Sequence, residues 1–588
     1  MKKEENLKAA ILIAIIIAVV SITPIASASD WEQFQKNNIN SGYTADSAPV
    51  SDPELAWSNH TSGTGMGGID ITPIVADGAV YVIDYQGILW SFDATTGIEN
   101  WNTDLTEGSG TFELSTPAYN DGIVYAALSS GSEGEGAGRV CAVYASNGTI
   151  RECEYYGLDT FQLNTPITYA DGKIYLGNSK YGTKDISTYY CIDAGDVTDL
   201  IWSRTAPHVT GYYWAGAAIV GDYIIYGDDT AIVTCLYKDN GTFVDHINVS
   251  EVCGVTPVEE IRSSIVWDES TDRIYFTGKK PSPVSGHAYA VSFNAATGDL
   301  GDTCDWVRDI GYSTSTPVVY NGRVYVCIGG MYGDSGVRCL NEADGTIRYS
   351  INKGASQASP AVSVADGHVY IYFTTNVNNG SAYCIEDTGS ALVEMWEWNP
   401  PEPDNQFILQ GMAIADGYVY FGTDYGRVYA LKEGQEQFDI PIYNGLNLIG
   451  IPLYQDDQTL NAVFGNNPVN LDKVRRFVPG EGYKTATYWS DNWVGTVSEV
   501  EPIEPEVGYE YERKGANYML TVLGTRCTGT ISTPIYNGMN LVGYVSFTEA
   551  DLSTFGNNPV DMDKVRRFVS GEGYKTATYW SGNWVGTV

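Results

Sequence analysis

One phrase recurs along most of the chain and constrains its fold more than any other feature. It consists of a small residue with Pro, a short apolar run, Asp-Gly or Asn-Gly, and alternating apolar residues that end near Tyr. An Asp-Gly or Asn-Gly pair between such segments predicts a tight β-hairpin, because Gly and Asn tolerate the positive φ of a primed turn. Clear copies begin at Thr72, Thr116, Thr165 and Thr316, weaker ones at Ser359 and Gly411, and degenerate ones at Ala215 and Ser263.

A second hairpin follows the first, best seen in residues 91–101 and around 294–298, so each unit holds four strands. Equivalent turn positions are 44 or 45 residues apart twice and 50 residues apart five times. Because one twisted four-stranded sheet cannot bury both of its faces, units of this length predict blades arranged radially. A solenoid is the competing repeat fold, but its repeats usually hold one or two elements. The turn positions are Gly78, Gly122, Gly172, Asp222, Asp272, Gly322, Gly367 and Gly417.

We therefore predict an all-β protein with a propeller of about eight blades over residues 29–434. The eighth copy ends near Lys432 without a fourth strand, whereas residues 54–58 form an orphan strand-like segment before the first copy. We expect this N-terminal segment to complete the last blade. Such a clasp removes the two sheet edges that an open ring would expose.

The residues also carry a family resemblance. Three features resemble the PQQ-like repeat propellers. They are the recurring phrase with Asp-Gly, the turn at 92–97 followed by Trp101, and the leading stretch 30–34 with Gly42. The resemblance covers about residues 30–434. It implies either of two functions, because the family includes quinoprotein alcohol dehydrogenases and non-enzymatic propellers of outer-membrane assembly.

The residues argue against the enzymatic branch. The resemblance implies that a dehydrogenase would hold its quinone beneath a disulfide between adjacent cysteines, with calcium, acidic and amide ligands and an Asp base. No two cysteines are adjacent, and no Cys-x-x-Cys-His segment is present for covalent haem. We predict no catalytic residues, no cofactor and no metal site. The turn residues Asp77 and Asp93 are better explained by turn chemistry than by calcium ligation.

The five histidines do not approach metal-ligand spacing, and we expect them to face solvent or lie in turns. They are His60, His208, His246, His287 and His368.

The N-terminus predicts export. Lys2, Lys3 and Lys8 precede the apolar stretch 9–25, and small residues follow at 26–28, which is the order of a secretory signal peptide covering residues 1–28. An uncleaved membrane anchor is the alternative, although Pro24 interrupts the run and the run is short for a span. We expect a secreted or cell-surface protein with no membrane span in the mature chain. The net charge of −39 disfavours nucleic acid as a partner.

In an oxidising compartment the ten cysteines are candidates for disulfides. Cys141 and Cys153 flank a Ser-Asn-Gly turn, and Cys327 and Cys339 flank a Gly-rich segment, so each pair is predicted to bridge a hairpin. The sequence does not pair Cys191, Cys235, Cys253, Cys304, Cys384 and Cys527, and buried free thiols are equally expected for them.

Export also makes the Asn-x-Ser/Thr sequons candidate glycosylation sites, although Asn-Gly-Thr is also ordinary turn composition. They lie at Asn59, Asn147, Asn240, Asn248 and Asn379.

A second, unrelated repeat begins after residue 434. We divide this part into a small β-module over 435–530 and an incomplete second copy over 531–588. Residues 464–469 return at 555–560 and residues 480–490 at 571–581, with an offset of 91 residues. Residues 483–494 read as a β-hairpin, whose Trp and Tyr side chains we assign to core packing before sugar or protein binding. The modules resemble those appended to archaeal and bacterial surface proteins.

The second copy ends at the equivalent of Val497 and lacks a counterpart of residues 498–529, so we expect missing strands or a truncated chain. Together the features predict a non-enzymatic binding, adhesion or scaffold protein of the envelope, with an archaeal envelope as the implied setting and an envelope protein or glycan as partner. A divergent PQQ-dependent oxidoreductase and a passive surface-layer component are the alternatives.

Overall fold

The computed structural model describes residues 30–526, except 62–67, 107–114, 130–137, 157–160, 181–184, 282–283, 330–334, 366, 405, 452, 456, 479–480 and 505–506, together with the backbone of 564–569, 573–580 and 583–586. The predicted signal peptide lies outside these residues. The chain divides into two compact units, Met1–Glu433 and Gly434–Val588.

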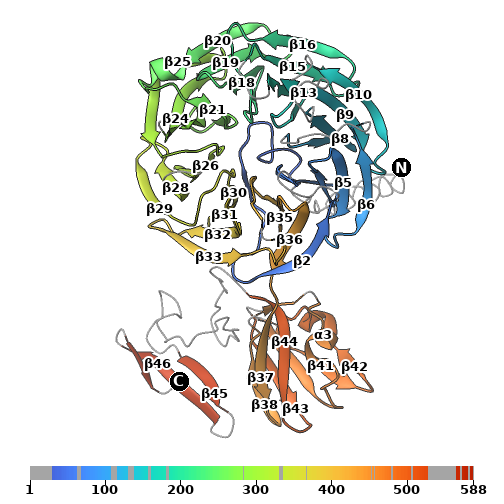
Figure 1. The fold of residues 1–588 in the computed structure, drawn as a ribbon. Helices are drawn as coiled ribbons and strands as arrows, with labels where there is room; N and C mark the ends of the chain where they lie inside the picture. Colours follow the sequence, from blue (N-terminus) through green and yellow to red (C-terminus); the bar gives the residue numbers. More distant parts are fainter. Residues whose placement is uncertain are drawn as a thin grey trace, which may run out of the picture. The chain divides into compact units, whose positions relative to one another are not determined.

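Eight four-stranded antiparallel blades form the first unit in its described residues and are arranged as a ring (Figure 1). Blades 1 and 2 hold β3 (Ile74–Ala76), β4 (Ala79–Ile83), β5 (Ile88–Asp93) and β6 (Glu99–Asp104), then β7 (Ala118–Asn120), β8 (Ile123–Leu128), β9 (Gly138–Tyr144) and β10 (Ile150–Tyr156). Blades 3 and 4 hold β12 (Thr168–Ala170), β13 (Lys173–Gly177), β15 (Thr188–Asp193) and β16 (Leu200–Thr205), then β17 (Ala218–Val220), β18 (Tyr223–Gly227), β19 (Ile232–Tyr237) and β20 (Phe243–Asn248).

The remaining blades follow the same order. Blades 5 and 6 hold β22 (Val266–Asp268), β23 (Arg273–Pro281), β24 (Val284–Asn294) and β25 (Asp299–Asp309), then β26 (Val318–Tyr320), β27 (Arg323–Ile328), β28 (Gly336–Asn341) and β29 (Ile347–Ile351). Blades 7 and 8 hold β30 (Ala361–Ser363), β31 (Tyr370–Thr374), β32 (Ala382–Asp387) and β33 (Leu392–Trp398), then β34 (Ala413–Ala415), β35 (Tyr418–Gly422), β36 (Arg427–Glu433) and β2 (Pro53–His60). Short elements between them are β1 (Tyr43–Thr44), β11 (Phe161–Gln162), β14 (Ser179–Lys180), β21 (Glu260–Ile261) and α2 (Val249–Val252).

The predicted clasp is confirmed. Strand β2 pairs antiparallel with β36 and supplies the fourth strand of blade 8, with Trp57 opposite Ala430. The predicted primed turns are also present, since Asp77 and Gly78 have φ values of 49° and 72° between β3 and β4. The strand that closes the ring and the turn at Asp77–Gly78 are thus found at the residues where the sequence predicted them.

Tryptophans on the outermost strands connect neighbouring blades. Trp101 in β6 donates its Nε1–H to the carbonyl of Ala145 in blade 2 at 2.7 Å. Gly148 lies against the same ring, where a Cβ atom would come within 2.6 Å, and its φ is 71°. Trp57 makes the corresponding bond to Ala94, so the same contact also joins blade 8 to blade 1.

The N-terminal segment 31–44 runs across the centre of the ring (Figure 1). Its backbone bonds to the innermost strands of several blades, through Trp31 with Val75, Asn38 with Ile219 and Gly42 with Val362. The buried Asn40 donates its amide protons to two carbonyls, of Ala217 and Ile265, both at 2.8 Å. The segment thus fills the centre of the propeller with paired polar groups, as buried backbone requires.

One predicted disulfide needs correction. Cys141 and Cys153 face each other directly across β9 and β10, with Cα atoms 4.1 Å apart, and they form a disulfide. Cys327 and Cys339 are buried free thiols. The register of β27 and β28 places Cys339 opposite Tyr325, which makes the two cysteines diagonal neighbours. Diagonal Cα atoms are roughly 7–8 Å apart, too far for a disulfide without backbone movement.

The structure also pairs two cysteines that the sequence left unassigned. Cys253, which follows α2, is bonded to Cys304 in β25. Cys191, Cys235 and Cys384 are buried free thiols, and burial raises the pKa of Cys191 and of Cys235 to about 12. Cys527 lies outside the described residues.

The second unit contains two sheets packed around a buried apolar cluster. The five-stranded sheet has the order β38 (Gly445–Ile449), β43 (Tyr509–Arg513), β40 (Lys473–Val478), β41 (Gly482–Trp489) and β42 (Asn492–Gly495). The three-stranded sheet has the order β37 (Glu436–Ile442), β44 (Tyr518–Arg526) and β39 (Leu453–Tyr454). Two short helices are α3 (Leu460–Phe464) and α4 (Val497–Val500).

In the second repeat, three strands are described: β45 (Lys564–Val569), β46 (Gly573–Trp580) and β47 (Asn583–Gly586). They pair in the same register as β40, β41 and β42. Strands β43 and β44 of the first repeat lie in residues 498–529. Within the described part of the chain, helices remain too short or too polar to cross a bilayer.

Candidate functional site

A small cavity lies at the centre of the ring, where loops before the innermost strands converge. It encloses about 20 Å³. Its lining comes from the N-terminal segment and from blades 2 to 8, and includes Phe34, Thr116, Pro166, Trp214, Arg262, Thr316, Ser359 and Gln410. Trp214 has a φ of 65°, which is unusual for an aromatic residue, and its Nε1 is buried without a hydrogen-bond partner among the described residues.

The described residues do not fit a quinone cofactor at this position. Pockets for cofactor-sized molecules enclose roughly 300–1,000 Å³, more than ten times the volume present here. Neither disulfide joins adjacent cysteines. The part of the chain that the structure describes also holds no group of three or more His, Cys, Asp or Glu side chains arranged for a metal. We derive no chemistry through a quinone.

A charged cluster extends from this cavity across blades 4 and 5. The Arg262 guanidinium binds both carboxylate oxygens of Asp229, at 3.1 and 3.2 Å, and Glu260 at 3.1 Å. Lys279 binds Glu260 at 2.8 Å. The ring of Tyr213 lies 4.6 Å from the Arg262 Cζ atom, within range of a cation–π contact. Burial opposes the charge of Arg262, but the carboxylates outweigh it and raise its pKa.

Two histidines belong to the same cluster. His208 Nε2 lies 2.9 Å from Asp228, which is 3% exposed. His287 Nδ1 lies 2.9 Å from the buried Glu259, which also accepts hydrogen bonds from Ser285 and Tyr289 at 2.9 Å. Burial alone would lower the pKa of His287, but the hydrogen bond and charge of Glu259 raise it.

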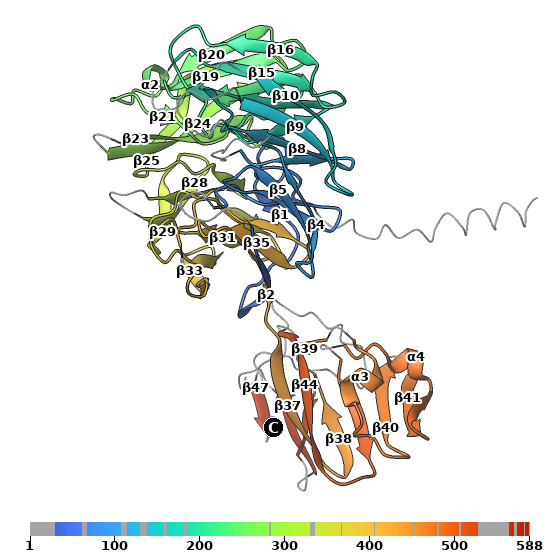
Figure 2. The same cartoon turned by 45° about the vertical axis from the view of Figure 1, so that its right-hand side comes forward.

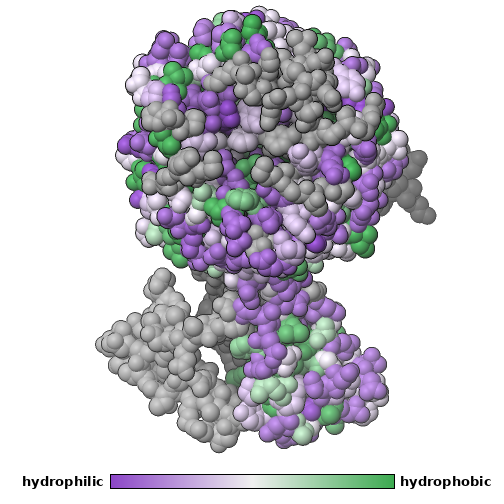
Figure 3. Space-filling model, in the orientation of Figure 1, coloured by the Kyte–Doolittle hydropathy of each residue, from purple (hydrophilic) through white to green (hydrophobic). Residues whose placement is uncertain are grey.

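The side chains of this cluster hold one another in fixed positions at the surface, and they do not form an activated nucleophile. Ser285 donates to Glu259 rather than to the imidazole of His287, so the serine is not activated by that histidine. Two large apolar side chains are exposed beside the cluster: Val209, adjacent to His208, is 52% exposed, and Val258, adjacent to Glu259, is 48% exposed. Apolar side chains next to rigid charged groups are typical of a surface that docks a protein. The described part of the propeller face in Figure 3 is mainly hydrophilic, with scattered hydrophobic residues.

A buried aspartate and a half-buried one lie close together where blade 1 meets blade 8. Asp70 precedes β3, and Asp424 lies between β35 and β36. Burial, the Asp424 charge and their mutual hydrogen bond hold the pKa of Asp70 well above its usual range, and burial also raises the pKa of Asp424. Asp70 Oδ1 is buried without a hydrogen-bond partner in the described residues. At this seam Asp70 therefore keeps its proton to higher pH than an exposed aspartate does.

A larger open groove of about 520 Å³ lies between the turns of blades 5 and 6. Its lining includes Arg273, Arg323 and Arg348. Arg273 binds the Glu342 carbonyl at 3.2 Å and Asp305 at 3.5 Å, and Arg323 binds Asp387 at 3.0 Å. Because Arg273 and Arg323 already have carboxylate partners, the groove is less suited to an anion than its three arginines suggest.

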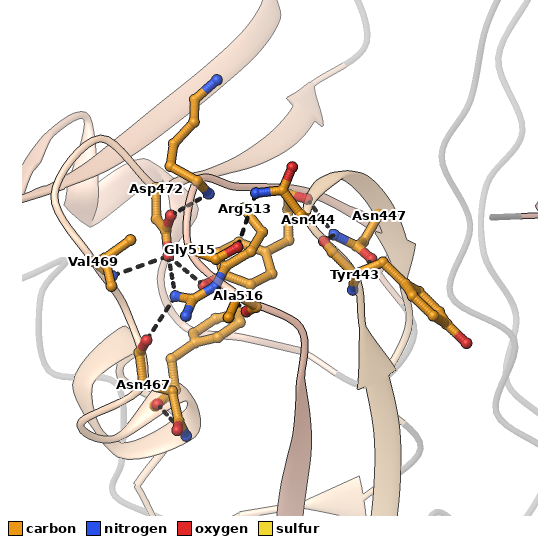
Figure 4. Close-up of polar contacts among 12 residues, drawn as sticks. Tyr443, Asn444, Asn447, Asn467, Val469, Asp472, Arg513, Gly515 and Ala516 are labelled. Atoms are coloured by element: carbon orange, nitrogen blue, oxygen red, sulfur yellow. Dashed lines mark hydrogen bonds and ion pairs between the residues drawn. The ribbon is translucent and has the colours of Figure 1, made fainter. Parts of the chain in front are cut away.

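The second unit has a buried ion pair at one end of its five-stranded sheet (Figure 4). Asp472 is fully buried, and Arg513 Nη1 donates to its Oδ2 at 2.6 Å. The Tyr511 hydroxyl and the backbone N–H groups of Val469 and Lys514 complete the shell at 2.6–3.0 Å. Every partner is internal, so this cluster fixes the loop before β40 to the end of β43.

The predicted glycosylation sites fall into two groups. Asn147 and Asn240 are exposed at outer turns, where each Oδ1 accepts the N–H two residues ahead at 2.9 Å, and Asn379 is also exposed. Asn59 donates its amide to the Gly97 carbonyl, and Asn248 caps α2 through Glu251. All five sites remain predictions, and the amide groups of Asn59 and Asn248 would have to leave these hydrogen bonds to carry a glycan.

Sequence reasoning missed most of the charged cluster. Three of the five histidines bond to carboxylates, namely His208, His287 and His368, instead of facing solvent alone. Their partners are 18–28 residues away and are brought close only by blade geometry. The run Glu259-Glu260-Ile261-Arg262 was the one local signal, because adjacent opposite charges lie beside a predicted strand.

Comparisons with known proteins agree with the architecture. A family model described as outer membrane protein assembly factor BamB matches residues 50–246. The BamB of Moranella endobia is 24% identical over 47% of this chain, and the alignment spans 66% of that protein, just under two thirds. The BamB of Salmonella typhimurium is 23% identical over 63% of this chain and 88% of its own length.

Among solved structures, the quinohemoprotein alcohol dehydrogenase ADHIIG of Pseudomonas putida HK5 superposes with a TM-score of 0.52 at 14% identity, over 69% of this chain and 80% of that one. At this identity the likeness shows the fold alone. The comparisons confirm the predicted resemblance to PQQ-like repeat propellers.

Proposed function

We propose that this protein is a non-enzymatic binding scaffold of the cell envelope, whose propeller docks a protein through the loops around the charged cluster. The observation that carries the proposal is the filled centre of the ring. A cavity of about 20 Å³ leaves no room for a cofactor-sized molecule, whereas Val209 and Val258 present apolar surface beside ordered charges.

The similarity to BamB supports the same class of function, since the names of those relatives describe assembly factors of the outer membrane. The signal peptide predicted at residues 1–28 supports an envelope location. The similar fold of a quinohemoprotein alcohol dehydrogenase keeps a quinone-dependent oxidoreductase as the competing function.

The test is site-specific photocrosslinking in envelope extracts. A benzoylphenylalanine is placed at Val209 or Val258 and, as a matched exposed control, at Ile98, which is 68% exposed in a blade 1 turn. We expect one discrete crosslinked product from positions 209 and 258 and none from 98. Identical products from all three positions, or none from any, would overturn the docking surface.

A second measurement tests the non-enzymatic claim directly. The mature protein is incubated with PQQ and Ca²⁺, desalted, denatured and assayed for bound quinone by absorbance. We expect no stoichiometric retention. Tight retention of one quinone per chain would replace the scaffold proposal with the oxidoreductase.

A further inference from the structure

The outer face of the hairpin formed by β40, β41 and β42 in the second unit differs from the core expected from its sequence. Trp493 is buried, but Trp489 is 52% exposed and Tyr483 is 39% exposed. Tyr483, Thr485, Thr487 and Trp489 alternate along β41, on the side opposite the fully buried Ala486. The strands lie side by side in Figures 1 and 2. Two rings thus stand at the ends of a row of hydroxyl groups, roughly 20 Å apart for six residues of strand.

The two repeats preserve the hairpin better than they preserve the strand at residues 445–454. Residues 464–497 and 555–588 differ at only four positions, and none of the four lies on the outer face of the hairpin. In contrast, residues 445–454 and 538–547 differ at six of ten positions. Two of these are the buried Ile451 and Leu453, replaced by Tyr544 and Ser546. The hairpin is thus kept nearly unchanged together with the buried residues behind it, Phe464, Val474, Ala486 and Trp493, whereas the strand at 445–454 has changed.

The charged side chains on this face bind one another. Arg475 binds Glu512 at 2.5 Å and lies 3.6 Å from Glu510, which also accepts the Tyr483 hydroxyl at 2.7 Å. Lys473 lies opposite Glu512 in the strand register, and Lys514 also binds Glu512, so three basic and two acidic side chains stand on this side. Because these charges are largely paired with one another, the face suits an uncharged ligand better than a charged one.

We propose that the hairpin face of each repeat binds a neutral polysaccharide. The apolar face of a sugar ring stacks on Trp489 or Tyr483, and its hydroxyl groups hydrogen-bond to Thr485 and Thr487 between them. The matching positions of the second repeat, Tyr574 and Trp580, have the same register. Two hairpins of nearly the same sequence fit a polymer that repeats one epitope along its length, because linked sites then gain avidity. This inference concerns the second unit and does not depend on the docking surface of the propeller.

Native gel electrophoresis through gels that contain a β-glucan, a mannan or a galactan tests the proposal with the mature full-length chain. We expect one of these polymers to retard the wild-type protein. Trp489→Ala or Trp580→Ala should weaken the retardation several-fold. The double variant should weaken it by about a hundred-fold, because avidity from linked sites is lost.

The control is the pair Tyr443→Ala and Tyr536→Ala, since Tyr443 is 41% exposed in the loop between β37 and β38 and has the same residue at its repeat position. It should retain wild-type retardation. All variants should melt within about 2 °C of wild type, as exposed substitutions do. Three outcomes would overturn the proposal: no retardation by any neutral polymer, retardation by uronic-acid polymers alone, or equal retardation of the double Trp variant. Hairpin-dependent capture of a deglycosylated envelope protein without polysaccharide binding would also overturn it, in favour of a protein ligand.

Discussion

The protein buries carboxylates in two contrasting ways. In the second unit, Asp472 has a guanidinium, a hydroxyl and two backbone N–H groups around it. At the seam of the propeller, Asp70 has another carboxyl group, Asp424, beside it. The first site compensates the charge of the aspartate and the second suppresses it by holding a proton. Burial by itself therefore does not decide whether an acidic residue stabilises its unit; the partner does.

Removing the compensated aspartate should have the largest effect. Asp472→Ala leaves Arg513 buried and unpaired, and we expect it to destabilise the second unit by about 3–5 kcal/mol. Hydrogen exchange should show lost protection in β40 and β43 and no change in the propeller. The double variant Asp472→Leu with Arg513→Met should recover most of this loss. If Asp472→Ala showed the same hydrogen-exchange protection as wild type, the ion pair would contribute nothing measurable to stability.

The seam should respond in the opposite direction. Asp70→Asn removes a carboxyl group that must otherwise hold a proton beside Asp424, and we expect it to stabilise the propeller at pH 7 by about 1 kcal/mol. The measurement is the thermal midpoint of the propeller transition. A destabilised variant would mean that the protonated Asp70 side chain makes a stabilising contact between blades 1 and 8.

The same pair gives the propeller a pH dependence of known sign. The pKa of Asp70 is raised in the folded state, so the folded protein binds more protons than the unfolded chain at pH values between the ordinary pKa near 4 and the raised one. Stability from this pair is therefore present at low pH and is lost as pH rises through that window. Comparing the midpoints of wild type and Asp70→Asn from pH 4 to 8 should show their difference growing with pH. A difference in midpoint that stays constant with pH would contradict a raised pKa of Asp70.

An exposed ion pair between the two strands of the clasp in blade 8 should matter least. Glu54 in β2 lies 3.0 Å from Lys432 in β36, with side chains 44% and 38% exposed. Because solvent and salt screen such pairs, Glu54→Gln should change stability by about 0.5 kcal/mol or less. Chemical unfolding at low and high salt is the check. A larger loss would mean that the clasp depends on charge rather than on its backbone pairing.

The predictions from sequence succeeded where the signal was local and failed where it depended on register or on distant contacts. The Asp77–Gly78 turn and the orphan strand around Trp57 were predictable, because turn chemistry and alternation lie within a few residues. Cys327 and Cys339 have the spacing of a hairpin disulfide, but a two-residue offset in the register separates them. The same limit hid the Asp472–Arg513 pair, which forms because β43 inserts between β38 and β40.

The hairpin of the second unit shows a further limit. Alternation in residues 483–489 correctly predicted the strand, and the positive φ values of Ser490 and Asp491 fit the predicted break. Alternation also predicts that one set of side chains faces the core. It does not predict which of the aromatic residues belong to that set. Trp493 is in the core and Trp489 is outside, and the choice is made by the three-stranded sheet and α3 packing on one side only.

The segment that crosses the propeller centre also sets the order in which the unit can be completed. Residues 31–44 are synthesised early, yet their backbone partners extend to Val362 in blade 7, and β2 pairs with β36 at the far end of the unit. The polar groups of these residues therefore stay bonded to water until nearly the whole propeller has been synthesised. Contacts of such sequence separation form slowly. The N-terminal segment of the propeller is therefore expected to complete its contacts last, although it is the first part of the propeller to be synthesised.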